Sequence, residues 1–132
     1  MSSRVTDVQA ADSVEAAQHF ESALRFETDC WDVHECTKNG SADFVLLDVR
    51  SNDVYRRGHV DGAISLPHAN INNETLDQFP PETMFVVYCA GPHCNGAHRA
   101  AIKLSGLKRP VKMMIGGVTG WLDEGFQLVS TP

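Results

Sequence analysis

Four side chains suited to nucleophilic or metal chemistry stand within ten residues of one another: Cys89, His93, Cys94 and His98. An apolar run of β-branched and aromatic residues, 85–88, precedes them, and good helix formers follow. A loop between a buried strand and a helix turns free backbone N–H groups toward its contents, and the helix dipole adds positive potential there. We therefore expect this loop to bind an anion and to hold one of its thiols as a thiolate.

Cys94 is the expected nucleophile of this loop. It is separated from Arg99 by four residues and lies next to the start of the predicted helix. Because thiolate activation falls off beyond the first helical turn, Cys89 at the end of the strand is the weaker candidate. His93 and His98 flank Cys94 and could act as bases or lower its pKa, although exposed loop histidines without a role are common.

The same four side chains also suit a zinc site, since thiolates and imidazoles are preferred zinc ligands. Two features disfavour such a site. His93 and Cys94 are adjacent in the sequence, which makes them awkward ligands for one tetrahedral ion, and no second ligand pair follows at a finger-like distance. We therefore predict no metal and no other cofactor.

The composition is that of a single globular domain, with 132 residues, 42% hydrophobic and 21% charged. A formal charge of −6 argues against nucleic acid or an anionic membrane surface as a partner. No apolar run approaches the length of a membrane span, and residues 1–12 lack the pattern of a signal peptide. We expect a cytoplasmic protein with reduced thiols, in which Cys30 and Cys36 are buried or half-buried and have no chemical role.

The N-terminal third is predicted to begin with a loose tail over residues 1–12. Two helices that pack on the domain are expected within residues 13–40. Apolar residues at helical spacing extend the first of them to about Phe26, with Asp12 or Ser13 as its N-cap, and Thr28 or Asp29 caps the second.

Strands and short helices then alternate from residue 44 to residue 124. The expected strands are 44–49, 63–66, 85–88 and 111–115, and the expected helices are 52–57, 73–79, 96–105 and 118–124. This alternation is typical of an α/β sandwich with a mostly parallel central sheet flanked by helices. Sites in such folds gather at the carboxyl ends of strands, where Asp48, Arg50, the cysteine loop and Gly116-Gly117 fall.

Three separated motifs resemble those of the rhodanese family of sulfurtransferases. The first is Leu47-Asp48-Val49-Arg50 with Tyr55 and the segment Gly58-His59-Val60-Asp61-Gly62-Ala63-Ile64. The second is the cysteine loop, and the third is Gly116-Gly117 with Trp121 and Gly125. They occur in the family's order over residues 44–126. The resemblance implies a rhodanese-like three-layer sandwich, which we place at residues 41–130.

The resemblance also implies an activity, the transfer of a sulfane sulfur from a donor such as thiosulfate to a thiophilic acceptor. The sulfur would be carried as a persulfide on Cys94, and the acceptor would be cyanide, a small thiol or a protein cysteine. Loop amides from Asn95 to Arg99 would stabilise the anionic sulfur, and Arg99 would bind the charge of the donor. Cys89 would be a core thiol or would resolve the persulfide into a disulfide. The residues expected to contact substrate are Asn95, Gly96, Ala97, His98 and His93.

Supporting roles are expected for residues of the other two motifs. Asp48 and Arg50 would brace the cysteine loop or else form a surface ion pair worth little. Gly116 and Gly117 would allow a close backbone approach beside the loop. His59 is expected to fix a turn.

One departure from the family pattern concerns the position of the cysteine. The usual rhodanese cysteine stands at the end of the strand, where this chain has Cys89, but the six-residue spacing to Arg99 begins here at Cys94. A subgroup of rhodanese-like bacterial proteins shares this Cys-x-Gly-Pro-x-Cys-Asn-Gly arrangement. Two alternatives are a rhodanese-like module that binds a partner without catalysis and a cysteine phosphatase or arsenate reductase. The loop of the phosphatases has one more residue between cysteine and arginine, which counts against the second alternative.

Overall fold

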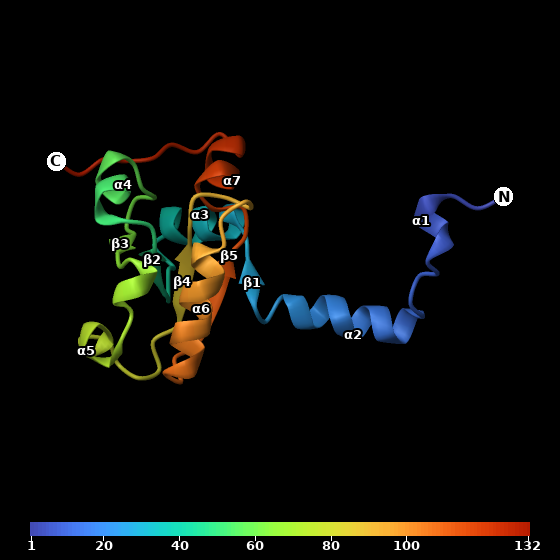
Figure 1. The fold of residues 1–132 in the computed structure, drawn as a ribbon. Helices are drawn as coiled ribbons and strands as arrows, with labels where there is room; N and C mark the ends of the chain where they lie inside the picture. The colour runs from blue at the N-terminus through green and yellow to red at the C-terminus, as the bar shows by residue number, and fades with distance from the viewer.

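A five-stranded parallel sheet forms the centre of the molecule in a computed structural model that describes residues 1–132 (Figure 1). The order of the strands in space is β1-β5-β4-β2-β3. Their bounds are β1 (Glu27–Thr28), β2 (Val45–Asp48), β3 (Ile64–Ser65), β4 (Phe85–Tyr88) and β5 (Val111–Met114). Because all pairings are parallel, the carboxyl ends of β2, β4 and β5 meet at one edge of the sheet.

Helices cover both faces of this sheet. On one face lie α6 (Gly96–Gly106), α5 (Asn73–Leu76) and a 3-10 turn (His68–Asn70). On the other lie α3 (Cys30–Lys38) and α7 (Gly117–Asp123), and α4 (Asn52–Arg57) packs Tyr55 against the same side. The predicted three-layer α/β sandwich is confirmed. None of the helices combines the length and the apolar character that crossing a bilayer requires.

The alternation of side chains along β4 builds the two halves of the core. Phe85 and Val87 face the α6 side, whereas Val86 and Tyr88 face the α3 and α7 side. All four residues are buried, as expected for a central parallel strand that is covered on both faces. The continuous apolar run in the sequence is therefore the signature of a strand without a solvent-exposed face.

Side-chain caps determine where two of the helices begin. The Ser51 hydroxyl accepts a hydrogen bond from the Val54 N–H (3.3 Å), and α4 has the bounds predicted from the sequence. The Asp29 carboxylate accepts from the Asp32 N–H (2.8 Å), which confirms Asp29 as one of the two predicted caps of α3.

The N-terminal segment departs from the prediction in three ways. A short helix, α1 (Arg4–Asp7), forms inside the predicted loose tail, because Ser3 and Thr6 make a reciprocal capping box. The next helix, α2 (Ser13–Ala23), buries no residue and projects away from the domain instead of packing on it (Figure 1). The sheet also begins earlier than residue 41, because β1 pairs with β5 as a two-residue edge strand too short to show a pattern.

Candidate active site

The cysteine loop leaves the carboxyl end of β4 and enters the first turn of α6. Within it, the Cys94 N–H donates a hydrogen bond to the Gly91 carbonyl (3.1 Å), which closes a tight turn and brings the chain back toward the strand end. The Sγ atoms of Cys89 and Cys94 consequently lie 2.6 Å apart. Both cysteines are free thiols, Cys89 buried and Cys94 partly exposed.

The two thiols have opposite electrostatic environments. The pKa of Cys94 lies below its ordinary value, because Cys89 donates a hydrogen bond to its sulfur and the Gly96 N–H donates another, against a smaller opposing effect of burial. Burial and the hydrogen bond to Cys94 raise the pKa of Cys89 to about 11. The arrangement therefore favours a thiolate at Cys94 and a protonated thiol at Cys89, in line with the expectation that Cys94 is the nucleophile.

The N-terminus of α6 supplies the anion-binding amides. Gly96, Ala97 and His98 occupy its first three positions, where backbone N–H groups have no acceptor within the helix. The predicted amide set extended one residue too far, because the Arg99 N–H already donates to the Asn95 carbonyl (2.9 Å). The Arg99 side chain is exposed, and its Nε donates to the Asn95 side chain at 3.2 Å.

Two cavities flank the cysteine pair. One, of about 380 Å³, is lined by His93, His98 and the β5–α7 connection, which includes Gly116 and Gly117. The other, of about 450 Å³, is lined by Arg50, Val54, His68 and Arg99. Cys89, Cys94 and Asn95 line both. The structure thus places the two predicted histidines on one side of the thiols and the two predicted arginines on the other.

The close backbone approach expected at Gly117 is present. Gly117 has φ +56°, and a Cβ atom at this position would collide with the Cys89 carbonyl and lie 2.9 Å from the Gly91 nitrogen. This contact lets the start of α7 hold the cysteine loop, because the Val118 N–H donates to the Cys89 carbonyl (3.1 Å) and the Thr119 N–H to the Ala90 carbonyl (2.9 Å).

Val118 and Thr119 are positioning residues that the sequence analysis missed. The Thr119 hydroxyl adds a third hydrogen bond, to the Ala90 carbonyl at 3.1 Å. Their place directly after a Gly-Gly pair, at the start of a helix, is the signal in the sequence that could have identified them, since the first N–H groups of a helix seek acceptors outside it.

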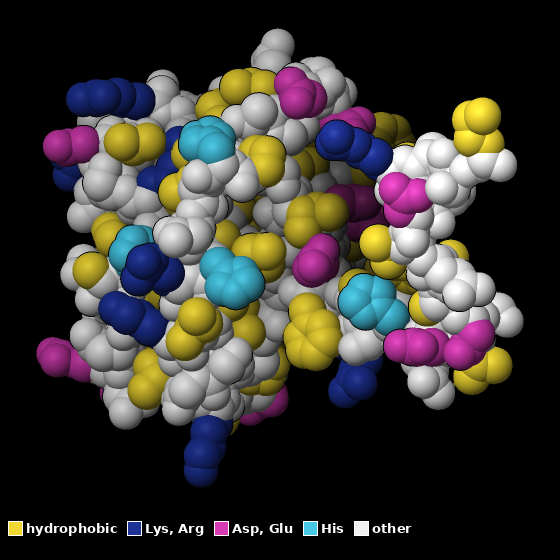
Figure 2. All heavy atoms as spheres, turned by 45° about the vertical axis from the view of Figure 1, so that its right-hand side comes forward, with side chains coloured by type: hydrophobic (Ala, Val, Ile, Leu, Met, Phe, Trp, Pro, Cys, Tyr) yellow, Lys and Arg dark blue, Asp and Glu magenta, His cyan; other side chains and the backbone are white.

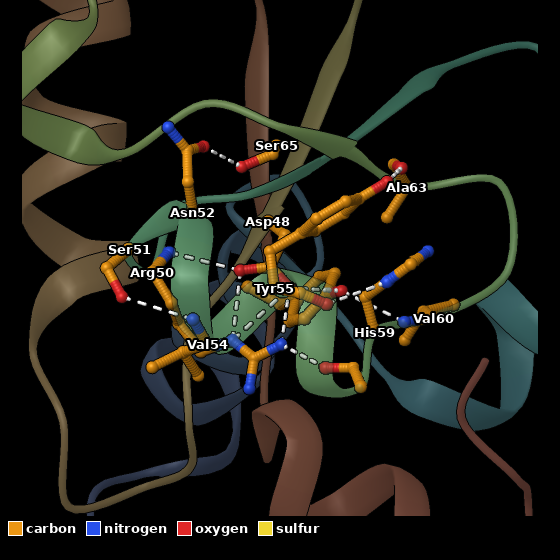
Figure 3. A network of polar contacts seen from close by, with 12 residues as sticks. Asp48, Arg50, Ser51, Asn52, Val54, Tyr55, His59, Val60, Ala63 and Ser65 are labelled. Atoms are coloured by element: carbon orange, nitrogen blue, oxygen red, sulfur yellow. Dashed lines mark hydrogen bonds and ion pairs between the residues drawn. The ribbon is translucent and has the colours of Figure 1, made fainter. Parts of the chain in front are cut away.

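Asp48 and Arg50 form a buried network (Figure 3). The Asp48 carboxylate is fully buried and accepts from the Arg50 guanidinium at 3.0 and 2.6 Å and from the Tyr88 hydroxyl at 2.7 Å. Arg50 also donates to the Gly58 carbonyl (2.6 Å), and the Tyr88 oxygen accepts from the Val60 N–H (3.0 Å). The surface ion pair that the sequence left open is excluded by this burial.

This network braces a different loop from the one expected. Its backbone contacts are to Gly58 and Val60, in the turn between α4 and β3, and it reaches the cysteine loop only through Tyr88, the residue before Cys89. Burial alone would lower the pKa of Arg50, but the hydrogen bonds and charge of Asp48 outweigh it and raise that pKa. Burial, followed by the Asp48 charge, raises the pKa of Tyr88, so the phenol stays protonated as a donor.

Cys30 and His59 have structural surroundings. Burial, with a smaller effect of the Asp29 charge, raises the pKa of Cys30 to about 11, and its thiol donates weakly to the Ile115 carbonyl (3.5 Å). His59 is buried, stacks on Tyr55 and hydrogen-bonds its backbone carbonyl (2.8 Å), so it fixes the turn as predicted. Nowhere does the chain gather three or more His, Cys, Asp or Glu side chains that could hold a metal ion.

Replacing Asp48 by Asn should destabilise the domain strongly. The substitution leaves the Arg50 side chain, which is only 9% exposed, without its counter-charge, and breaking one partner of a buried ion pair costs about 3–5 kcal/mol. Urea unfolding followed by far-UV circular dichroism measures the change in the free energy of unfolding. The matched control is Asp53→Asn, an exposed carboxylate on α4. A loss no larger in Asp48→Asn than in this control would show that the network does not stabilise the fold.

Removing the Cys89 thiol should make Cys94 less reactive. In Cys89→Ala the largest cause of the lowered Cys94 pKa disappears, so the thiolate fraction at neutral pH falls and alkylation of Cys94 by iodoacetamide slows several-fold. Cys89→Ser keeps a hydrogen-bond donor at the same place and should stay close to the wild type. Peptide mapping of reduced protein across a pH series gives the rates. Equal pH profiles for Cys89→Ala and wild type would contradict the assignment of Cys89 as donor.

Comparison with known proteins places these features in a family. A family model described as a rhodanese-like domain matches residues 32–124. The crystal structure of BH2092 protein from Bacillus halodurans is 36% identical, with a TM-score of 0.87 over 91% of this chain and 88% of that one. A thiosulfate sulfurtransferase from Pseudomonas aeruginosa is 27% identical, with a TM-score of 0.66 over 90% of this chain and 22% of its own.

A curated relative extends the family to a larger protein. The HTH-type transcriptional regulator Rv0324 of Mycobacterium tuberculosis is 31% identical over 91 residues, which are 64% of this chain and 40% of the regulator. This chain therefore spans about two fifths of the length of that relative. The family-model match covers well over half of the chain and includes the first motif, the cysteine loop and Gly116-Gly117 with Trp121, and the chain belongs to the rhodanese-like domain family.

Proposed function

We propose that this protein is a sulfurtransferase that carries a sulfane sulfur as a persulfide on Cys94. The observation that carries the proposal is the position of Cys94. Its partly exposed thiol has a lowered pKa, lies beside the free amides at the N-terminus of α6 and opens onto two cavities. A thiolate in such a place can attack a soft sulfur and hold the resulting anion.

The reaction with thiosulfate has two steps. The Cys94 thiolate attacks the outer sulfur of thiosulfate, a bond forms between the two sulfur atoms, and sulfite leaves with the electron pair of the broken S–S bond. The anionic outer sulfur of the persulfide is then stabilised by the N–H groups of Gly96, Ala97 and His98 and by the dipole of α6. Cyanide or a thiol next attacks the outer sulfur and restores the Cys94 thiolate.

The arginine and histidine side chains around the loop line different cavities, one for the sulfur donor and one for the acceptor. Arg99 and Arg50 both line the cavity of about 450 Å³, where the exposed Arg99 guanidinium would attract the sulfonate part of the donor. His93 and His98 face the opposite cavity, through which the acceptor would approach. We expect the physiological acceptor to be a small thiol or a protein cysteine. Because such thiols are kept reduced in the cytoplasm, we propose that the reaction takes place there.

The relatives support the same class of reaction. The thiosulfate sulfurtransferase from Pseudomonas aeruginosa matches 90% of this chain, although that match makes up 22% of its own length. The alternative of a cysteine phosphatase or arsenate reductase is weakened by the loop, because only four residues separate Cys94 from Arg99.

The proposal predicts where sulfur is found after exposure to thiosulfate. Reduced Cys89→Ser protein, incubated with thiosulfate without oxygen, should gain the mass of one sulfur atom on the peptide that contains Cys94, and cyanide should remove it as thiocyanate. Cys94→Ser should gain none and should form no thiocyanate above background. Cys36→Ser is the matched control, because Cys36 lies on α3 outside both cavities.

Two results would contradict the proposal. Persulfide that forms on Cys89 in the Cys94→Ser variant at the wild-type rate would move the carrier to the other thiol. Absence of sulfur uptake by every variant, together with hydrolysis of an aryl phosphate by the wild type, would favour the phosphatase alternative.

A further inference from the structure

The two thiols of the cysteine loop are close enough to react with each other. Their Sγ atoms lie 2.6 Å apart, and a disulfide bond has a length of about 2.05 Å, so the two sulfur atoms are within reach of each other. We propose that Cys89 resolves the Cys94 persulfide, which makes the protein a persulfide reductase that releases hydrogen sulfide. This inference rests on the proposed function, because it needs the persulfide to form first.

Gly96 leaves room for the two sulfur atoms because it has no side chain. A Cβ atom on Gly96 would lie 2.7 Å from the Cys89 sulfur and 3.5 Å from that of Cys94. Glycine at the first position of α6 therefore lets both thiols share the N-terminus of one helix. Cys89 is the residue that follows β4, so its position is fixed by the most buried strand of the sheet, while Cys94 lies on the more exposed part of the loop.

The resolving step balances without any further reactant. The Cys89 sulfur attacks the Cys94 sulfur, a bond forms between the two Sγ atoms, and the bond from Cys94 to the outer sulfur breaks. The outer sulfur leaves with the electron pair and takes the proton of Cys89, which gives hydrosulfide. The sulfane sulfur is reduced by two electrons and the two thiols are oxidised to one disulfide. Cys89 is held as a protonated thiol until then, which supplies the proton that the leaving sulfide takes.

Return to the dithiol requires a reductant of the dithiol class, which donates two electrons and becomes a disulfide itself. Its thiolate would attack Cys94, because this residue is partly exposed, whereas Cys89, which lines the same two cavities, is buried. A mixed disulfide on Cys94 and then release of both thiols complete the cycle.

A single-turnover experiment without cyanide or added thiol tests the inference. Reduced wild-type protein receives one equivalent of thiosulfate under anaerobic conditions, and sulfide and intact mass are followed. We expect one equivalent of sulfide, loss of two hydrogen atoms in mass and a peptide linked through Cys89 and Cys94. Cys89→Ser should keep the added sulfur atom and release no sulfide, and Cys36→Ser should behave as the wild type.

The outcomes separate this inference from the proposed function. If wild type and Cys89→Ser both keep the added sulfur and release no sulfide, the reductase activity is wrong and the sulfurtransferase stands. If Cys89→Ser takes up no sulfur, both are overturned. Protein kept without thiosulfate must remain a dithiol, because oxidation in that sample would make the disulfide irrelevant to the reaction and would also count against the inference.

A second and independent observation concerns the N-terminal arm, which we define as residues 13–26. Its helix α2 has 11 residues and buries none of them, and Val14, Phe20 and the C-cap residue Leu24 are 70%, 68% and 69% exposed. Figure 2 shows the N-terminal segment as a separate lobe with apolar and acidic side chains. Helices shorter than about 12–15 residues are marginal in water without packing, so this face needs a partner.

The arm's own domain does not provide that partner in this structure. After Ala23 the chain continues in helical turns, with N–H groups of Leu24, Arg25 and Phe26 donating to carbonyls three residues earlier. The Phe26 carbonyl then accepts from the Met113 N–H at the sheet edge. Folding the arm back would break these hydrogen bonds, because no slack segment separates α2 from β1.

A groove at the base of the arm fits a second copy of the helix. It has a volume of about 750 Å³ and is lined by Ala101, Ile102 and Val111 together with Arg25, Lys108 and Arg109. Helix α2 and its N-cap carry Asp12, Glu15 and Glu21 and no Lys or Arg, whereas the groove is lined by three basic side chains and one acidic side chain, Glu27, so the net charges of helix and groove are opposite. The match with BH2092 covers 91% of this chain. Residues 27–132 alone make up a smaller share of the chain, so the matched region must include part of the arm. We infer that two copies form a symmetric dimer in which each arm occupies the groove of the other.

Sedimentation velocity of the full chain tests this dimer. We expect a dimer for the wild type and a monomer for Leu24→Asp on the arm and for Ile102→Asp in the groove, where Ile102 is 63% exposed. Leu122→Asp, at an exposed position on α7, is the control that should stay dimeric. A monomeric wild type at high micromolar concentration would overturn the dimer. A dimer that Leu24→Asp dissociates but Ile102→Asp does not would overturn the groove as the docking site.

Discussion

The buried carboxylate of Asp48 is the constraint on which the arrangement of the sheet edge depends. A charge without solvent exposure must be matched inside the protein, and here Arg50 and Tyr88 both donate to it. Since Asp48 ends β2 and Tyr88 ends β4, the carboxylate ties together the strand ends from which the active loops start. Arg50 also donates to the Gly58 carbonyl, and the Tyr88 oxygen accepts from the Val60 N–H, so the neighbouring turn is fixed by the same network.

The Asp48 network fixes the end of β4, and the start of α7 fixes the next two residues, Cys89 and Ala90. Gly117 allows the approach, and the first amides of α7 donate to the carbonyls of Cys89 and Ala90. The loop can therefore curl so that Cys94 returns to Cys89, and the N-terminus of α6 meets both sulfur atoms. Two chemically identical side chains then acquire different roles, because one is buried and donates a hydrogen bond while the other is partly exposed and accepts it.

The two inferences meet at one place in the structure. His98 and Met113 line both the groove at the base of the arm and the cavity beside the thiols. An arm from a second copy that occupies the groove would therefore lie next to the entrance through which an acceptor or a reductant reaches Cys94. Dimer formation would then affect access to the thiols through the residues that line both the groove and the cavity, with no rearrangement of the sheet.

The sequence by itself determined the fold class, the strands of the core and the loop that carries the thiols. These features follow from local patterns: a continuous apolar run for a strand buried on both faces, as in 85–88, and a hydroxyl or carboxylate at a helix start, as at Ser51 and Asp29. The edge strand at Glu27–Thr28 could not be predicted, because two residues show no period and the pairing with β5 spans most of the chain.

Only the tertiary structure decided how the predicted site residues are grouped. The sequence places Asp48 and Arg50 at a strand end, but whether they are buried and which loop they brace depends on contacts with Tyr88 and Gly58, which are far away or across a turn. It likewise places Cys89 and Cys94 five residues apart without stating that their sulfur atoms touch. The packing of α2 was mispredicted for the same reason. An amphipathic helix shows that a face must be covered, while the partner that covers it is set by geometry outside the helix.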